Sequence, residues 1–421
     1  MKNPEWSKRL FNSLRASYES GFQHYLLSLV TIQGSVFVTQ LIVAKLLGPN
    51  QFGVVRAVES VISILIIFAS IGMPTLAVKL PQELTSTDDR SRVLLRLLLI
   101  TGIASFVVAV FCAFWSYVMG KEGHAPYLMM LVWMIVFPAS SRVCQNYFVG
   151  IKSVKTVSSM TMGISVFSIV IMAALVRFGG LNGWVIGRYL SEMFLFTGFA
   201  LVLRKSLAKH GGLSKEYSFG ALIHAGVPNM MSILARVGMD NIGVVFLTFN
   251  NQPHDQLGYY GIGILFTMPV LLVAGAIANI AIPSFVEALP NLLAVRRKFF
   301  KVATTNFALT GLASCIGLVV GPAMIKLYFP GYLTAIPIMQ ILLLVIPFHS
   351  VLLTSNSLLL AGSKTSVILS INLFELVMVF ALFGILVPKF GVTGAAIATL
   401  MTDILASLIF VYVALKITAK S

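Results

Sequence analysis

Long apolar segments alternate with short polar ones along nearly all of the 421 residues. A helix of about 20 residues crosses the hydrocarbon core of a bilayer, and each apolar segment reaches that length. Because backbone polar groups in lipid must be satisfied within the segment, we predict that every segment is an α-helix. The pattern predicts an all-α polytopic membrane protein with twelve transmembrane helices, at residues 22–46, 54–78, 93–118, 127–150, 156–178, 184–204, 219–248, 257–287, 299–320, 338–361, 366–387 and 394–415.

Composition supports this class. Hydrophobic residues make up 58% of the chain, charged residues 10%, and the mean hydropathy is +0.93. A soluble chain of this length could not bury so much apolar surface. The three cysteines lie inside predicted spans, and no metal-ligand, phosphate-loop, catalytic-triad or nucleic-acid motif occurs. We therefore expect a protein that is not an enzyme, that uses no cofactor or metal, and that acts within or across the bilayer.

The basic residues lie mostly on one side of the predicted membrane. With both termini in the cytoplasm, the inner loops and tails hold 21 of the 30 lysines and arginines, and the outer loops hold 5. Short cytoplasmic loops are enriched in Lys and Arg, so the asymmetry predicts the orientation. It also accounts for most of the net charge of +16 without a nucleic-acid partner.

The two halves of the chain carry similar turns. A Gly-x-Lys turn follows spans four and ten, and a basic-Phe-Gly turn follows spans five and eleven. These turns begin at Gly150, Gly362, Arg177 and Lys389. The offset in sequence number is the same for both pairs, and one gap then aligns Glu192 in span six with Asp403 in span twelve. Six spans per half is an even number, which predicts two parallel repeats.

The repeat and the charge pattern together divide the chain. We expect a cytoplasmic amphipathic N-terminal segment, a first six-helix bundle, a cytoplasmic linker, a second six-helix bundle and a cytoplasmic tail. Their bounds are 1–21, 22–204, 205–218, 219–415 and 416–421.

Several charged residues lie at membrane depth, where they are costly and usually face a cavity or a partner. In span seven, polar residues from Asn229 to Asp240 fall on one helical stripe, beside Pro228, which should bend the helix. Spans one and two carry polar stripes as well, which suggests a hydrated cavity. Candidate substrate-binding residues are Arg56, Arg142, Arg188, Arg236 and Asn229, and candidate ion-coupling residues are Glu59, Asp240, Glu375 and Asp403.

A purely structural role is the alternative for part of this set. Three arginines have an acid three or four residues away, so each pair could be neutralised on its own helix. These pairs are Arg56–Glu59, Arg188–Glu192 and Arg236–Asp240. Four arginines and five acidic residues lie at membrane depth, so these numbers do not establish a positively charged cavity. For His224 and His349 we predict buried, hydrogen-bonded rings rather than a proton relay.

Four short motifs occur in a consistent order along the chain. They are Leu46-Leu-Gly-Pro-Asn-Gln-Phe-Gly53, Ala225-Gly-Val-Pro228, Gly258-Tyr-Tyr260 and Gly391-Val-Thr-Gly-Ala-Ala-Ile-Ala398. With the twelve-span layout, they resemble Wzx-type flippases of polysaccharide biosynthesis, which belong to the multidrug/oligosaccharidyl-lipid/polysaccharide exporter superfamily. The resemblance covers essentially the whole chain. The fourteen-span lipid II flippases of that superfamily fit less well, because two spans are missing.

The resemblance implies a fold and a function. Two six-helix bundles would enclose a central cavity, with arginines that hold a pyrophosphate or acidic sugars. The substrate would be an undecaprenyl-pyrophosphate-linked oligosaccharide, moved from the cytoplasmic to the outer leaflet of the bacterial inner membrane for O-antigen, lipopolysaccharide or capsule synthesis. Membrane lipids, a polysaccharide polymerase and a chain-length regulator would be the partners.

Two other functions stay open. One is a cation-coupled multidrug or other small-molecule exporter of the same superfamily, in which a membrane acid would titrate. The other is a membrane-integral polysaccharide polymerase or ligase, which would need a large outer loop, whereas the longest outer connection spans about residues 321–337. For a transporter we expect the halves to rock. An outer gate would then close between the loops at Gly48-Pro49 and Gly258.

Overall fold

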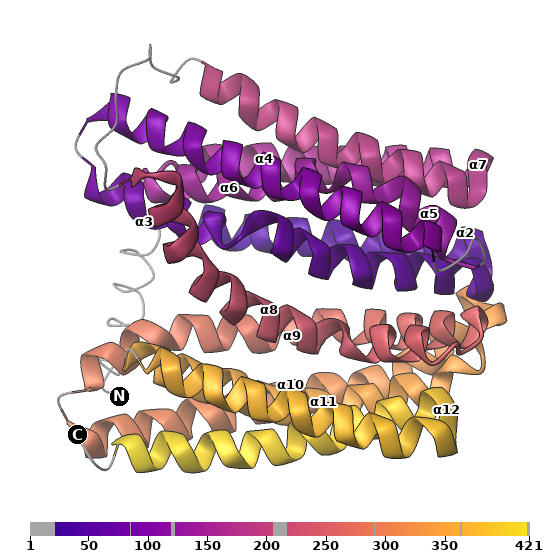
Figure 1. The fold of residues 1–421 in the computed structure, drawn as a ribbon. Coiled ribbons are helices and arrows are strands. Elements are labelled where there is room, and N and C mark those ends of the chain that lie inside the picture. Colours follow the sequence, from indigo (N-terminus) through magenta and orange to yellow (C-terminus); the bar gives the residue numbers. More distant parts are fainter. Residues whose placement is uncertain are drawn as a thin grey trace, which may run out of the picture. The chain divides into compact units, whose positions relative to one another are not determined.

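The computed structural model describes residues 22–84, 86–118, 123–204, 217–289, 291–362 and 364–418, and every regular element within them is a helix. The predicted N-terminal segment, most of the linker and the end of the tail lie outside the described residues. The helices are α2 (Phe22–Ser70), α3 (Met73–Glu83), α4 (Thr87–Val118), α5 (Ala125–Leu131), η1 (Val132–Ile135), α6 (Val136–Gly150), α7 (Val154–Arg204), α8 (Phe219–Phe249), α9 (His254–Ala288), α10 (Leu292–Tyr328), η3 (Pro330–Tyr332), α11 (Ala335–Ala361) and α12 (Thr365–Thr418) (Figure 1).

Three of these helices are each two spans joined by a sharp turn. The helices α2, α7 and α12 have 49, 51 and 54 residues, so as single straight helices they would far exceed the thickness of a bilayer. Each contains one glycine with positive φ, a conformation that side chains resist: Gly48 (73°), Gly180 (54°) and Gly391 (56°). The chain turns back at these glycines and starts a second helix.

The twelve predicted spans are therefore present as helices. In the described residues, eight helices are long and apolar enough to cross a membrane, and bent α8 makes a ninth. Since three of them are double, the count is twelve. The second span is interrupted at Ile71–Gly72, which separates α2 from α3. In α8 the helix continues through Pro228, and its 74° bend lies between Gly238 and Asn241, well beyond the predicted position.

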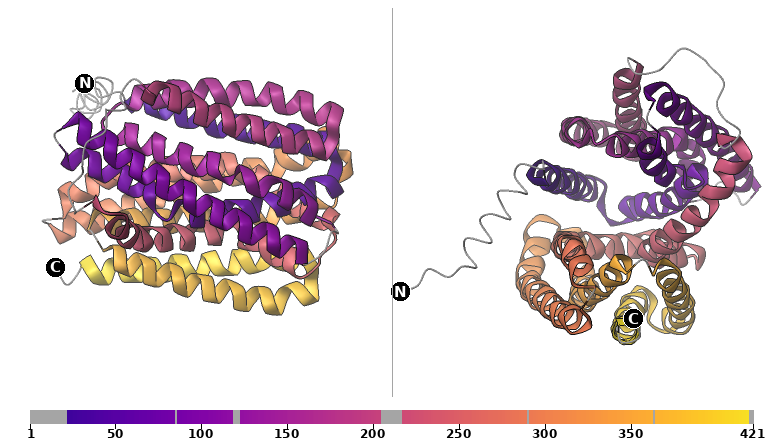
Figure 2. Two further views of the ribbon diagram at one scale, coloured as in Figure 1. Left: turned by 45° about the horizontal axis from the view of Figure 1, so that its top comes forward. Right: turned by 90° about the vertical axis from the view of Figure 1, so that its left-hand side faces the viewer.

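The chain folds into two compact units. The first comprises residues 1–39 and 65–231, and the second comprises residues 40–64 and 232–421. In the first unit, α6 packs against α3, α4 and α7; in the second, α11 packs against α9, α10 and α12. The right-hand view of Figure 2 looks along the helices of the second unit, where α9 to α12 are seen end on. These units do not coincide with the two halves of the sequence, because each contains a segment from the other half. The six-helix bundles at 22–204 and 219–415 stay a prediction.

Backbone geometry repeats between the two halves, with Gly391 in the place of Gly180. The φ and ψ angles are 54° and −132° at Gly180, and 56° and −136° at Gly391. Three residues later, a Cβ on Gly183 would meet the carbonyl oxygen of Leu175 at 1.8 Å, and one on Gly394 would meet that of Leu386 at 2.3 Å. The same offset relates the turn after α6 to the turn after α11. It is one position shorter than the predicted offset, and it aligns Glu192 with Asp403 without a gap.

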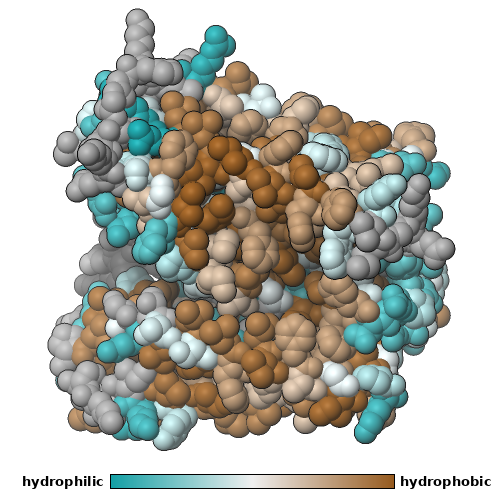
Figure 3. All heavy atoms as spheres, in the orientation of Figure 1, coloured by the Kyte–Doolittle hydropathy of each residue, from teal (hydrophilic) through white to brown (hydrophobic). Residues whose placement is uncertain are grey.

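The surface agrees with a multi-pass membrane protein. On the face shown in Figure 3, apolar side chains cover the middle of the helices, and hydrophilic ones gather near the helix ends. Large exposed apolar side chains line α4 at helical spacing, among them Ile103, Phe106 and Val110. Such side chains are stable when they face lipid.

Candidate functional site

The hairpin at Gly48 fixes the polar residues of α2 on the second unit. A Cβ on Gly53 would meet the carbonyl oxygen of His254 at 1.6 Å, and one on Gly258 would meet that of Pro49 at 2.0 Å. The two backbones therefore touch, which only glycine permits. Two of the sequence motifs thus contact each other within one compact unit. The loops of the expected outer gate, at Gly48-Pro49 and Gly258, are in contact in this structure, and their opening during transport stays a prediction.

Aromatic rings stabilise the same contact. Phe52 is fully buried, and its ring meets that of Tyr332 edge on, with centroids 6.3 Å apart. The Tyr332 hydroxyl donates a hydrogen bond of 2.8 Å to the carbonyl oxygen of Ala44. Burial raises the pKa of Tyr332, which lies in η3 outside the spans, and the neighbouring Tyr259 raises it further. Aromatic packing and this hydrogen bond therefore hold the hairpin against η3.

Arg56, one turn beyond Phe52, is a buried arginine that forms no hydrogen bond with the described residues. Its side chain is 11% exposed, and Nη1 lies 3.6 Å from Oε2 of Glu59. Glu59 itself accepts two hydrogen bonds from Nε2 of Gln40, at 2.9 and 2.8 Å. Arg56 donates to no described residue, and Arg56 Nε, Gln40 Oε1 and Ser60 Oγ are buried without partners. Unpaired buried donors are costly, so this hairpin has spare capacity for a polar ligand.

Glycines make room for this cluster. A Cβ on Gly261 would meet Cγ of Arg56 at 2.6 Å, and one on Gly243 would meet the Tyr260 hydroxyl at 2.4 Å. The Tyr260 hydroxyl lies 3.4 Å from Oγ1 of Thr399 and within electrostatic range of Arg56. Polar groups from α2, α9 and α12 thus meet inside the second unit.

Asp403 lies one helical turn beyond Thr399 and pairs with a histidine. Its Oδ2 is 2.8 Å from Nδ1 of His349 on α11. The prediction that His349 is hydrogen-bonded is confirmed, but its side chain is only half-buried. His224 is exposed, so the prediction of buried rings is wrong. Tyr260 is also within electrostatic range of Asp403, which connects this pair to the Arg56 cluster.

The first unit holds a second group of charged residues, on α6 and α7. Nη2 of Arg188 lies 3.3 Å from Oε1 of Glu192 on α7, and their side chains are 31% and 15% exposed. Arg142 on α6 interacts electrostatically with both of these residues. Among the described residues, the ion pair of Glu192 is with Arg188, and Arg142 forms no ion pair with it.

The two clusters occupy equivalent places. Glu192 and Asp403 are separated by the same offset as Gly180 and Gly391, which defines the backbone repeat. Each acid has a basic neighbour on the equivalent helix, Arg142 on α6 and His349 on α11. The local pairs Arg56–Glu59 and Arg188–Glu192 predicted as a structural alternative do form.

The remaining candidates lie on α8 and α12. Nδ2 of Asn229 donates to the carbonyl oxygen of Ala225 on its own helix, at 3.0 Å. Arg236 is exposed, and the side chain of Asp240 lies outside the described residues, so their pairing stays a prediction. Glu375 is 1% exposed on α12. No group of three or more metal-ligating side chains occurs in the part of the chain that is described.

Sequence reasoning missed three polar members of the second unit's cluster. Gln40, Tyr260 and Thr399 are all uncharged, whereas charge at membrane depth is the signal that points to a polar site. Tyr260 belongs to the motif Gly258-Tyr-Tyr260, and the small residues around it are the one sign in the sequence of close packing there. Gln40 and Thr399 had no signal, because their importance depends on contacts with distant helices.

Comparisons with solved structures agree on the fold. The lipid II flippase MurJ in an inward closed conformation superposes with a TM-score of 0.75 at 14% identity, covering 92% of this chain and 86% of that one. An inward-facing multidrug resistance MATE family transporter of the MOP superfamily gives 0.70 at 15% identity, covering 92% and 96%. The eukaryotic MATE transporter AtDTX14 gives 0.68 at 12% identity, covering 95% of each chain. No curated protein matches the sequence.

The family itself follows from the sequence profile. The profile described as polysaccharide biosynthesis protein matches residues 21–289, which is well over half of the 421 residues. At such low sequence identity, the structural matches speak for the fold alone. The chain therefore has the helical fold found in MATE transporters and MurJ, and it belongs to the polysaccharide biosynthesis protein family.

Proposed function

We propose that the protein is a flippase of the Wzx type, which moves an undecaprenyl-pyrophosphate-linked oligosaccharide from the cytoplasmic to the outer leaflet of a bacterial inner membrane. Both termini are then cytoplasmic, as the charge asymmetry predicts. Membership of the polysaccharide biosynthesis family supports a saccharide substrate. The fold shared with a lipid II flippase supports a lipid-linked one.

The observation that carries the proposal is the buried Arg56 without hydrogen bonds. A guanidinium group presents five N–H donors in a planar fork that matches phosphate oxygens. Arg56 donates to no described residue, and its only ion pair, with Glu59, is 3.6 Å long. A pyrophosphate oxygen would supply the missing acceptor, and in a low dielectric that contact is stronger than in water. Arg142, Arg188, Arg236 and Asn229 complete the proposed substrate set.

Transport in vesicles tests the proposal. The purified protein is reconstituted with an undecaprenyl-pyrophosphate-linked oligosaccharide, and the access of a membrane-impermeant reagent to the sugar is followed over time. Arg56→Met should slow flipping about tenfold to a hundredfold, the equivalent of about 1.5–3 kcal/mol for a hydrogen bond to a charged group. Arg56→Lys should recover part of the rate, because it restores the charge without the fork.

A matched control separates binding from folding. Arg177 is an exposed arginine near the turn at Gly180, and Arg177→Met should flip at the wild-type rate. Equal rates for Arg56→Met and Arg177→Met would contradict the role of Arg56. Vesicles that do not flip the lipid but accumulate organic cations would replace the flippase with the multidrug exporter, a function that the MATE-like fold also permits.

Energy coupling through acids is the second part of the proposal. Glu59, Asp240, Glu375 and Asp403 are the proposed couplers, and Glu375 and Asp403 are 1% and 6% exposed. The two states of the cycle must bind an ion or the substrate differently for transport to have a direction. With all four changed to Asn or Gln, we expect ion-driven accumulation to stop. Undiminished accumulation would rule out coupling through these acids.

A further inference from the structure

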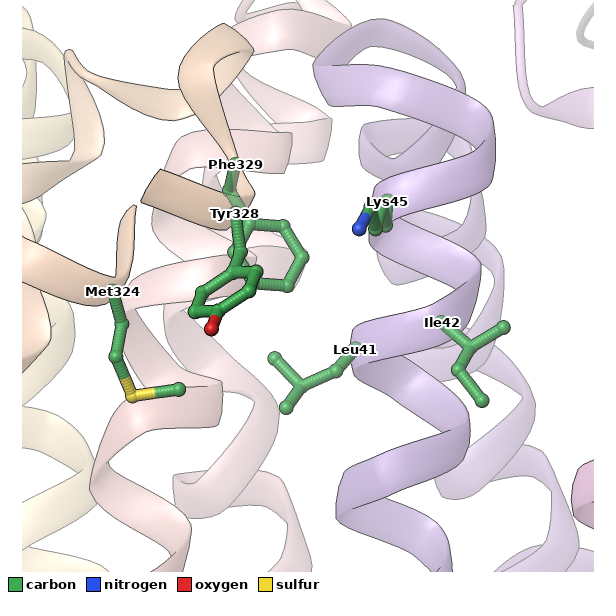
Figure 4. Close-up of a pocket in the computed structure, with 6 residues that line it drawn as sticks. All are labelled: Leu41, Ile42, Lys45, Met324, Tyr328 and Phe329. Atoms are coloured by element: carbon green, nitrogen blue, oxygen red, sulfur yellow. The ribbon is translucent and has the colours of Figure 1, made fainter. Parts of the chain in front are cut away.

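A shallow groove lies on the second unit, between the end of the first span and the end of α10. Its volume is about 260 Å³. The lining residues are Leu41, Ile42, Lys45, Met324, Tyr328 and Phe329. Figure 4 shows side chains from α2 and from α10 facing each other across the gap. Binding sites for compact, drug-sized molecules usually exceed about 300 Å³, so a slender chain fits this groove better.

One of the six residues that line this groove, Lys45, is charged. Lys45 is exposed, and its Nζ lies 5.8 Å from the ring centroid of Tyr328. Among the described residues, no carboxylate forms an ion pair with Lys45, and no acidic residue lines the groove. A contact with the face of a ring does not neutralise the charge. The groove therefore complements an anion that carries an apolar chain.

The order of polar and apolar residues matches that of a lipid. Lys45 lies three residues before the turn at Gly48, and Tyr328 is the last residue of α10, so both lie at helix ends. Leu41 and Met324 lie four residues earlier on the two helices, one turn deeper. Lysine and tyrosine at the ends of spans typically occupy the headgroup region, where lysine extends toward the polar layer.

We propose that this groove binds an anionic membrane phospholipid, with its phosphate at Lys45 and one acyl chain along Leu41 and Met324. The site lies in the leaflet that contains the Gly48 end of the protein. It shares no residue with the proposed substrate set, and the proposal does not depend on the transport function.

Native mass spectrometry of the purified protein titrated with phosphatidylglycerol tests the site. Lys45→Met removes the charge but keeps an apolar chain. The matched control is Lys326→Met, which removes an exposed lysine from the same end of α10 without touching the groove. A lysine near anionic lipid corresponds to about a fivefold change in affinity. We therefore expect Lys45→Met to bind phosphatidylglycerol about fivefold more weakly than wild type, and Lys326→Met to bind as wild type does.

Two further measurements address the headgroup and the chain. Wild type should bind phosphatidylethanolamine more weakly than phosphatidylglycerol. Lys45→Met should bind the two lipids with equal affinity. Met324→Trp should fill the groove and weaken both lipids. Equal affinities for Lys45→Met and Lys326→Met, no preference for the anionic lipid, or unchanged binding by Met324→Trp would each overturn the proposal.

Discussion

Replacing Gly258 with alanine places a methyl group where two backbones touch. The new Cβ would lie 2.0 Å from the carbonyl oxygen of Pro49 and 2.8 Å from its carbonyl carbon. Ordinary contact begins at 3.4 Å, so the hairpin and α9 would have to separate by about 1.4 Å. Both obstructing atoms belong to the backbone, and no flexible side chain can move aside.

The cost follows from this separation. Overpacking of a well-packed site costs about 1–3 kcal/mol. Alanine in place of glycine in a helix returns about 0.5–1 kcal/mol. Separation also loosens Phe52 from Tyr332 and the hydrogen bond from Tyr332 to Ala44, which contributes about 1 kcal/mol. We expect Gly258→Ala to destabilise the second unit by about 1–3 kcal/mol.

Thermal unfolding of detergent-purified variants measures the effect. Gly275 provides the control, because it lies on the same helix and a Cβ there would meet no heavy atom within 4 Å. Gly275→Ala should be neutral or up to about 1 kcal/mol more stable than wild type. If Gly258→Ala unfolded at the same temperature as Gly275→Ala, the hairpin and α9 would not form a tight backbone contact.

Two other predictions concern orientation and pH. A cysteine introduced at Lys209 should be labelled only from the cytoplasmic side, and one at Lys121 only from the outer side. Labelling of position 209 from outside intact cells would reject the orientation. Because burial raises the pKa of Tyr332, its neutral hydroxyl stabilises the fold below about pH 10, and this contribution is lost as the pH rises through the higher pKa of the folded state. Tyr332→Phe should lose about 1 kcal/mol at neutral pH and lose less stability above pH 10 than wild type, and identical alkaline profiles would exclude this residue as a cause.

The fold could be predicted in detail because a bilayer permits few solutions. Apolar length alone placed all twelve spans, since lipid requires each to be a helix. The turns at Gly48 and Gly391 lay within motifs that the sequence displayed. Breaks within spans were harder. Pro228 was expected to bend its helix, and the 74° bend of α8 lies further along, between Gly238 and Asn241.

The site was predictable only in part. Charge at membrane depth identified Arg56, Glu59 and Asp403, and helical spacing identified the pair Arg56–Glu59. The partners Gln40 and His349 come from other positions and other helices, and no local pattern connects them. Tertiary contacts between neutral polar residues produce almost no pattern that a single sequence can reveal.

The exchange of segments between the two units bears on how this chain can be divided. Residues 40–64 lie with the second unit and residues 219–231 with the first, although each belongs to the other half of the sequence. The described residues on either side of the linker, Arg204 and Tyr217, both belong to the first unit. A cut in the linker therefore leaves part of α2 of the second unit on the first fragment and the first part of α8, which belongs to the first unit, on the second fragment. Such fragments resemble domain-swapped partners and should fold only when expressed together.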